Sequence, residues 1–424
     1  MTSCAESTIN ATPAAAVDRM RSPRRRGRTT YVMLFVLLGL ALAVSGTPSP
    51  LYGTYAREWR LSPLDLTVVF AVYALAAMSA LLVAGPLTDA IGRKPVLLMS
   101  AVGLLAGLAV FMTAHSIVGL LIARVIHGAS IGSAAVAVGA ALLDVRPDDT
   151  ARTGHLTGIV LASGMGVGVL GSAVLAQLLP HPLVLPYAVI AALTALTLIV
   201  LALSPETHGA RTGRIRIVRP GVPAPIAADF AFATLGAMAS WIVLGIYLSL
   251  FPQLTAQETG IHSLIFGGSA VAAMTFSAAV AQALTRHAGA RRLALYGDVG
   301  LVAASLLSIP MVLSGHAIAV FVGSVALGGS FGMTFSGSFR HLTQVIPAAQ
   351  RGSVMSAFYL CCYAAMAVPT ILAGAAASRW GLPHTYAGFA VVVAMACGAA
   401  GMMAYRSAPP VTLHVADRTG SMSR

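Results

Sequence analysis

The sequence predicts an all-α membrane protein in which twelve transmembrane helices form two pseudo-symmetric six-helix bundles. Charged residues make up 9% of the 424 residues and hydrophobic residues 57%, and the mean hydropathy is +0.84. A soluble domain carries about 25% charged residues. Apolar stretches long enough to cross a bilayer as a helix recur twelve times along the chain. The longest polar interruption separates the first six from the last six, which predicts two bundles.

The apolar stretches divide the chain into five segments. In the first half they cover residues 31–51, 64–84, 96–114, 117–143, 154–179 and 184–203. In the second half they cover residues 226–251, 263–284, 293–313, 317–339, 353–377 and 384–405. The predicted segments are a basic cytoplasmic N-terminal tail (1–30), an N-terminal bundle (31–203), a cytoplasmic linker (204–225), a C-terminal bundle (226–405) and a cytoplasmic C-terminal tail (406–424).

An internal repeat agrees with the division into two halves. The segment Leu87–Lys94, between the second and third stretches, aligns with Leu284–Arg291, between the eighth and ninth, at an offset of 197 residues. Leucine, threonine, glycine and the final cation recur, whereas the acid of the first copy does not. Transporters built from two parallel halves show such symmetry.

The cations lie mainly in segments assigned to one side of the membrane. Of the 26 Lys and Arg residues, 22 lie on that side, three (Arg57, Arg60 and Arg379) lie on the other, and Arg124 lies inside a stretch. Cytoplasmic loops carry such an excess of cations. The net charge of +13 therefore indicates a protein of the cytoplasmic membrane with both termini in the cytoplasm. It needs no nucleic-acid partner to explain it.

The first stretch allows a second interpretation. Arginines precede an apolar run, and Ala43–Gly46 offers a cleavage site, as in a secretory signal peptide. We favour a retained first helix, because the twelve spans then divide evenly into two halves.

Neither the cysteines nor the histidines form a pattern typical of a cofactor site. Cys4 lies in the N-terminal tail, and Cys361, Cys362 and Cys397 lie in apolar stretches, so no disulfide is expected. The eleven histidines contain no H-x-x-x-H pair, which argues against a metal site. The chain also lacks the G-x-x-x-x-G-K-[ST] loop that binds ATP phosphates. We expect no cofactor, and a proton gradient as the driving force.

The segment that starts at Gly85 places an acid, two glycines and two cations at a predicted membrane boundary. Gly92 permits a tight turn, Asp89 can lie against a helix N-terminus or pair with Arg93, and Arg93 with Lys94 marks the cytoplasmic side. The alternative is an ordinary basic loop between two spans. The full order is Gly85-Pro86-Leu87-Thr88-Asp89-Ala90-Ile91-Gly92-Arg93-Lys94.

This segment resembles the loop between helices 2 and 3 of the major facilitator superfamily, written G-x-L-x-D-x-x-G-R-K/R. The resemblance covers about residues 30–405 and is to the twelve-helix drug and metabolite transporters of bacteria. It implies two bundles that rock about a central site. It also implies that the loop acts as a conformational gate which clasps the state closed toward the cytoplasm.

Arg124 is the one cation predicted in the middle of a span. It begins a segment, Arg124 to Gly132, that resembles the family's fourth-helix pattern R-x-x-Q-G-x-G, with His127 in place of Gln. A charge at that depth costs at least about 2.5–3.5 kcal/mol, so it usually faces a polar cavity and serves function. His127 shares the same helix face and can relay protons near neutral pH. Alternatively, Arg124 only bonds backbone carbonyls and locks helices together.

Three glycines of the fifth span, Gly164, Gly168 and Gly171, are predicted to pack against another helix. The segment is also faintly similar to the antiporter signature G-x-x-x-G-P. Val169 occupies the proline position, however, and this weakens the case for export by proton antiport.

The acids place few candidates for coupling inside the membrane. Asp65 follows Ser62-Pro63 and is expected to cap a helix start. No carboxylate occupies the centre of a predicted span, where a proton-coupled carrier normally has one. Asp298, expected to be partly buried, and Asp229, near an inner helix end, remain the candidates for coupling. A structural role is also open for each.

Helices 1, 4, 7 and 10 line the cavity in the family that the chain resembles. That analogy selects five further pocket candidates, of which Trp241 and Tyr247 also suit interfacial or packing roles. The five are Ser45, Thr47, Trp241, Tyr247 and Phe335.

The sequence therefore predicts a secondary transporter that moves a small organic molecule by alternating access. We expect proton-coupled efflux of a drug-like or amphipathic metabolite, because the charge-poor spans offer few groups that bind sugars or ions. Uptake or facilitated passage of a metabolite such as a sugar or organic acid is the alternative. An intramembrane enzyme would need clustered ionisable groups, and only Arg124 and His127 approach that. The expected partners are the lipid bilayer and the substrate, and the expected oligomeric state is a monomer.

Overall fold

The described part of the chain is built from α-helices. The computed structural model describes residues 13–204, 206, 213 and 219–406. Among these residues, twelve helices are long and apolar enough to span a bilayer, from Arg28–Gly46 to Leu382–Ala404, and no strand occurs. This confirms the predicted fold class, since a helix satisfies its own backbone hydrogen bonds in lipid.

The first half contains six spanning helices and one short helix, α2, after the first span. They are α1 (Pro13–Gly46), α2 (Tyr52–Trp59), α3 (Pro63–Ile91), α4 (Arg93–Thr113), α5 (Ile117–Val145), α6 (Thr150–Leu178) and α7 (Leu185–Leu203).

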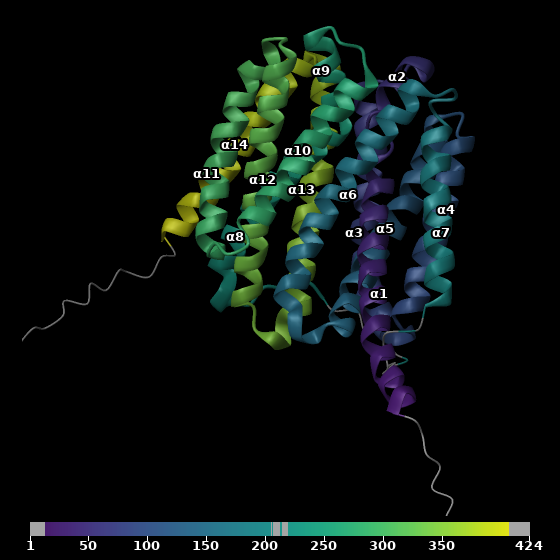
Figure 1. Ribbon diagram of the computed structural model, residues 1–424. Helices are drawn as coiled ribbons and strands as arrows, with labels where there is room; N and C mark the ends of the chain where they lie inside the picture. The colour runs from purple at the N-terminus through teal and green to yellow at the C-terminus, as the bar shows by residue number, and fades with distance from the viewer. Residues whose placement is uncertain (1–12, 205, 207–212, 214–218, 407–424) are drawn as a thin grey trace, which may run out of the picture.

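The second half repeats this order, with the short helix α9 after its first span. They are α8 (Ala227–Ser249), α9 (Phe251–Thr259), α10 (Leu264–Leu284), α11 (Ala290–Leu313), α12 (Ala317–Val345), α13 (Arg351–Trp380) and α14 (Leu382–Arg406). The two halves stand side by side, with α1–α7 on one side of the molecule and α8–α14 on the other (Figure 1).

Two helix pairs join the halves, α6 with α10 and α3 with α13. Both contacts depend on small residues. A Cβ on Gly268 of α10 would lie 2.6 Å from the Cβ of Ala173 in α6. A Cβ on Gly374 of α13 would overlap the Thr67 hydroxyl of α3. Small residues allow such close approach where lipid supplies no hydrophobic driving force between helices.

The two ends of the bundle differ in charge and in closure. We call the end that holds the α3–α4 and α10–α11 turns the basic end, and the other the opposite end. At the opposite end the Ser49 hydroxyl donates to the Leu248 carbonyl at 2.8 Å, and the Ser263 hydroxyl contacts the Gln177 side chain at 2.8 Å. These bonds tie α1 to α8 and α6 to α10 across the halves. Leu51 and Phe251 are fully buried beside them, so the halves are closed together at this end.

The start of α3 confirms the predicted cap. The Asp65 backbone N–H donates to the Ser62 hydroxyl at 3.2 Å, and the Asp65 carboxylate accepts from the Ser62 backbone N–H at 2.8 Å. The reciprocal pair satisfies two amide groups that the helix leaves open.

The ends of α1 differ from the prediction. The helix ends at Gly46, five residues before the expected end at residue 51, because Pro48 and Pro50 cannot continue the backbone ladder. It begins at Pro13, so residues 13–30 of the expected tail are helical, as extension of an existing helix adds one bond per residue. Residues 1–12, most of the linker 204–225 and residues 407–424 of the C-terminal tail lie outside the described residues.

The glycines of α6 pack against α1 at two of the three predicted positions. A Cβ on Gly164 would lie 2.4 Å from the Gly39 carbonyl oxygen, and one on Gly168 would lie 2.1 Å from that of Ala43. Gly171 has no neighbour within 4 Å of such a Cβ, so the structure does not place it at the contact. The helical period turns it away from α1.

This difference predicts that Gly168→Val and Gly171→Val behave differently. The first should lower the thermal unfolding midpoint of the purified protein, because overpacking a tight contact costs about 1–3 kcal/mol. The second is the matched control and should leave the midpoint near that of wild type. Equal midpoints for the two variants would contradict the α1–α6 contact.

Candidate functional site

The α3–α4 turn brings an ionic cluster together at the basic end. Gly92 ends α3 and begins α4 with a φ of 103°, a backbone conformation that favours glycine. The turn places Arg93 in the first position of α4, beside the last turns of α3 and α5. The conformation therefore depends on the glycine that the sequence pattern singled out. A Cβ on Gly85, which belongs to the same pattern, would meet no atom within 4 Å.

Arg93 pairs with two acids from different helices. Its guanidinium contacts the Asp89 carboxylate one turn back in α3, and its Nε donates to Oδ2 of Asp144 in α5 at 3.2 Å. The Arg93 side chain is only 9% exposed, whereas Asp89 is largely exposed. A buried guanidinium shared between two carboxylates forms strong, charge-assisted hydrogen bonds.

The first residues of α4 also bind the chain that follows α7. The Glu206 carboxylate accepts from the backbone N–H groups of Arg93 and Lys94 at 3.2 Å. Lys94 Nζ donates to the Ala202 and Ser204 carbonyls at 2.8 and 2.7 Å. A carboxylate is favourable at a helix N-terminus, and a cation at a C-terminus.

We call Asp89, Arg93, Lys94, Asp144 and Glu206 the basic-end cluster. The contacts named above all join helices of the first half. The sequence pattern identified the first three residues and missed Asp144 and Glu206. Both are acids at predicted inner ends of spans, but nothing in their local sequence links them to Arg93.

Arg124 of α5 is locked to the end of the first span. It is 1% exposed, its Nε donates to the Tyr52 hydroxyl at 3.0 Å, and its Nη1 donates to the Ser45 carbonyl at 3.4 Å. The guanidinium carbon also lies 5.3–5.7 Å from the ring centres of Tyr52, Tyr73 and Phe111. These cation–π contacts and hydrogen bonds replace the hydration of the charge. Tyr52, expected near the outer mouth, is instead buried as its partner.

His127 lies one turn from Arg124 in an apolar setting. It is fully buried, its ring centre lies 5.0 Å from that of Phe111, and neither ring nitrogen forms a hydrogen bond of normal geometry with the described residues. A proton relay needs a chain of hydrogen bonds, and this geometry provides none around His127.

The five pocket candidates do not form one site. The Thr47 hydroxyl donates to the Ala43 carbonyl of its own helix, and Ser45 is buried below it. Tyr247 is fully buried and stacks on Phe251 at 3.8 Å. By contrast, Trp241 and Phe335 are half-buried.

Trp241 and Phe335 belong to a continuous aromatic surface that spans three helices of the second half. The Trp241 ring lies 6.1 Å from Phe335 in α12 and 4.7 Å from Tyr363 in α13. Phe335 in turn lies 6.3 Å from Phe331 and 6.1 Å from Phe339, and Phe339 lies 6.3 Å from Tyr359. Tyr363 and Tyr73 of the first half share one core cluster, so this surface adjoins the boundary between the halves. We call it the aromatic wall: Trp241, Phe331, Phe335, Phe339, Tyr359 and Tyr363.

Asp229 has a titratable partner that sequence reasoning missed. His341 Nε2 of α12 lies 2.8 Å from Oδ1 of Asp229 in α8. The histidine side chain is mostly buried, and its ring lies 5.5 Å from that of Phe232. The two residues are 112 positions apart, so no local pattern relates them.

Asp298 is more deeply buried than predicted. The start of α11 at Ala290 precedes the expected start at residue 293, and the carboxyl is 1% exposed. Neither oxygen forms a hydrogen bond of normal geometry with the described residues. It lies apart from the aromatic wall, between α11 and α14.

Comparison with known proteins agrees with this architecture. The sequence profile of the Major Facilitator Superfamily matches residues 33–370. Proteins of Burkholderia mallei (strain SAVP1) and Burkholderia pseudomallei (strain 668), each called an uncharacterised MFS-type transporter, are 24% identical over 411 residues, covering 91% of this chain and 95% of theirs.

Two solved structures share the fold. The human organic anion transporter MFSD10 (TETRAN) superposes with a TM-score of 0.65 at 17% identity, covering 88% of this chain and 99% of that one. A mutant of the nucleoside transporter NupG gives a TM-score of 0.69 at 12% identity, covering 87% and 99%.

Proposed function

The chain belongs to the Major Facilitator Superfamily, and on that premise we propose that it exports a drug-like or amphipathic metabolite by proton-coupled alternating access. The family and the fold point to a membrane transporter rather than an enzyme. The two structural neighbours are called transporters of organic anions and of nucleosides, so the fold does not select a substrate class. The proposal for the substrate therefore depends on the side chains of this chain.

The aromatic wall is the observation that favours an amphipathic substrate. Trp241 and Phe335 are half-buried and lie among further aromatic rings from α12 and α13. Aromatic faces give large apolar contact areas, and the Trp and Tyr polar groups can orient a ligand. Such a surface suits a flat or amphipathic molecule better than a sugar, which requires many hydrogen-bond partners.

Alternating access is supported by the closure of one end. The Ser49–Leu248 and Ser263–Gln177 bonds join the halves at the opposite end. We assign the basic end to the cytoplasm, because cytoplasmic loops carry the cations. In this assignment the protein acts as a monomer in the cytoplasmic membrane, with both termini inside. Cysteines introduced at positions 92 and 289 should then react with an impermeant reagent only from the cytoplasmic side.

We propose the Asp229–His341 pair as the proton-coupling group. It links α8 to α12 near the basic end, and histidine ordinarily changes charge near neutral pH. Arg124 and His127 suit this role less, since one is bound to Tyr52 and the other lacks hydrogen-bonding partners of normal geometry.

The proposed function is tested with a panel of compounds in proteoliposomes under imposed pH and sodium gradients. Exchange of protons for an amphipathic compound would support the proposal. Transport driven in the direction of uptake, or of sugars and organic acids alone, would favour the alternative. Transport that follows sodium and ignores pH would contradict proton coupling.

His341→Gln should uncouple transport from the pH gradient. Glutamine can still donate to Asp229 but does not titrate, so accumulation driven by the gradient should fall at least about tenfold, while substrate exchange without a gradient persists. His384→Gln, at an exposed histidine of the opposite end, is the matched control. Equal gradient dependence in the two variants would remove His341 from the coupling step.

A further inference from the structure

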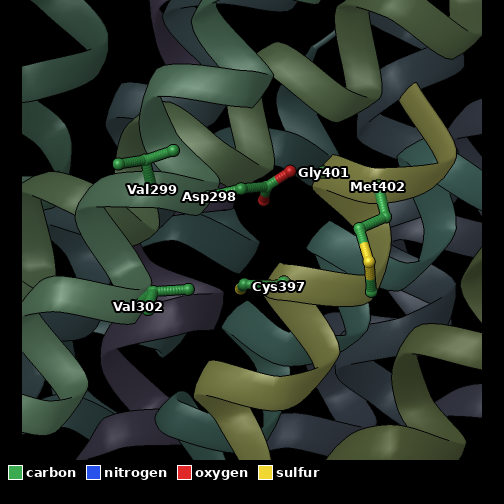
Figure 2. A pocket seen from close by; sticks show the side chains of 7 residues that line it. Asp298, Val299, Val302, Cys397, Gly401 and Met402 are labelled. Carbon is green, nitrogen blue, oxygen red and sulfur yellow. The ribbon is translucent and has the colours of Figure 1, made fainter. Parts of the chain in front are cut away.

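A cavity opens between α11 and α14, away from the residues proposed for transport. Its volume is about 380 Å³, within the range of small-molecule sites. Figure 2 shows the Asp298 carboxyl projecting from α11 into the space beside α14. Apart from Asp298 and Cys397, its lining side chains are aliphatic or absent. The lining residues are Asp298, Val299, Val302, Cys397, Gly398, Gly401 and Met402.

The cavity faces the lipid. Val299 is 68% exposed and Met402 63% exposed, and both belong to helices that span the membrane. In a bilayer, such apolar side chains contact acyl chains. A ligand can therefore reach the cavity from the hydrocarbon region without crossing water.

The bottom of the cavity contains a carboxyl group without a partner. Thr334 of α12 is positioned to donate to Asp298, but no hydrogen bond of normal geometry forms to either oxygen from the described residues. An ionised carboxyl in an apolar setting is costly unless a cation or hydrogen-bond donors satisfy it. The site thus combines a charge that needs a cation with walls that exclude water.

We propose that this cavity binds an amphipathic organic amine taken from the bilayer. The ammonium contacts the Asp298 carboxyl, and the apolar part of the ligand lies against Val302, Met402 and the surface left open by Gly398 and Gly401. A neutral lipid chain would leave the carboxyl unsatisfied, and a bare metal ion would leave the apolar walls empty. The proposal goes beyond the proposed function, because it concerns binding and is measured without transport.

The glycines of α14 provide variants that fill the cavity without distorting the helix. A Cβ on Gly401 would meet no atom within 4 Å, and the same is true of Gly388 on the same helix. Gly401 lines the cavity and Gly388 does not. Gly401→Leu therefore blocks the proposed site, and Gly388→Leu is its matched control. Asp298→Asn removes the charge, with Asp148→Asn at an exposed position as its control.

The test measures binding of a radiolabelled twelve-carbon n-alkylamine to the purified protein in lipid nanodiscs, with the twelve-carbon alcohol as the neutral competitor. We expect saturable binding of the amine that the alcohol does not displace. Affinity should fall at least about tenfold in Asp298→Asn, since it loses a buried charge pair. It should fall in Gly401→Leu as well, and remain unchanged in both controls.

Three results would overturn the proposal. Displacement by the alcohol would indicate an apolar lipid site, and wild-type affinity in Gly401→Leu would place the amine elsewhere. Displacement of the amine by sodium at constant ionic strength, with wild-type affinity retained in the controls, would assign the carboxyl to a metal ion.

Discussion

Replacing Arg124 with alanine is expected to abolish transport of any substrate identified in the compound panel and to lower the unfolding midpoint. The substitution removes a side chain that is 1% exposed and bonds the Tyr52 hydroxyl and the Ser45 carbonyl. Both acceptors would remain buried without a donor, which costs about 1–3 kcal/mol each. The vacant space among Tyr52, Tyr73 and Phe111 adds the cost of a cavity.

Two milder variants separate charge from geometry at this position. Arg124→Lys keeps the charge but has no planar fork to bridge two acceptors, so most activity should be lost. Tyr52→Phe removes one acceptor and retains the ring, so it should fall between Arg124→Lys and wild type. Transport is measured in proteoliposomes and stability by thermal unfolding in detergent. Wild-type transport in Arg124→Ala would show that the residue only packs.

Replacing Arg93 with alanine is expected to cut transport at least about tenfold while the protein remains in the membrane. The variant leaves the Asp89 and Asp144 carboxylates facing each other without the buried cation that neutralises both. Because α3 also packs against α13 of the second half, a change at the end of α3 alters the boundary that must move during switching. Asp89→Asn removes one of the two ion pairs and should reduce transport strongly but less completely.

Arg152→Ala is the control for Arg93→Ala. Arg152 lies near the same end, is mostly exposed and makes only a 3.9 Å contact with Asp149. Exposed pairs of this kind contribute about 0–1 kcal/mol, so transport should be close to wild type. If Arg93→Ala retained wild-type turnover, the basic-end cluster would have no part in switching.

Hydropathy was sufficient to predict the helices, whereas their partners could not be read from it. The twelve spans follow from stretches of about 20 apolar residues, since lipid leaves the backbone no other way to satisfy its hydrogen bonds. The Ser62–Asp65 cap was predicted because a capping box involves residues only three positions apart. Arg93 and Asp144 are 51 positions apart, and Arg124 and Tyr52 are 72 apart.

The sequence by itself determined the fold class, the position of the gate segment and the family resemblance, because these depend on local composition and spacing. Only the tertiary structure decided which groups meet: Arg93 with Asp144 and Glu206, Arg124 with Tyr52, and Asp229 with His341. It also buried Asp298 and turned Gly171 away from α1. The physical reason is that apolar periodicity specifies that a helix spans the bilayer, while the rotation of each helix about its axis is set by packing against its neighbours.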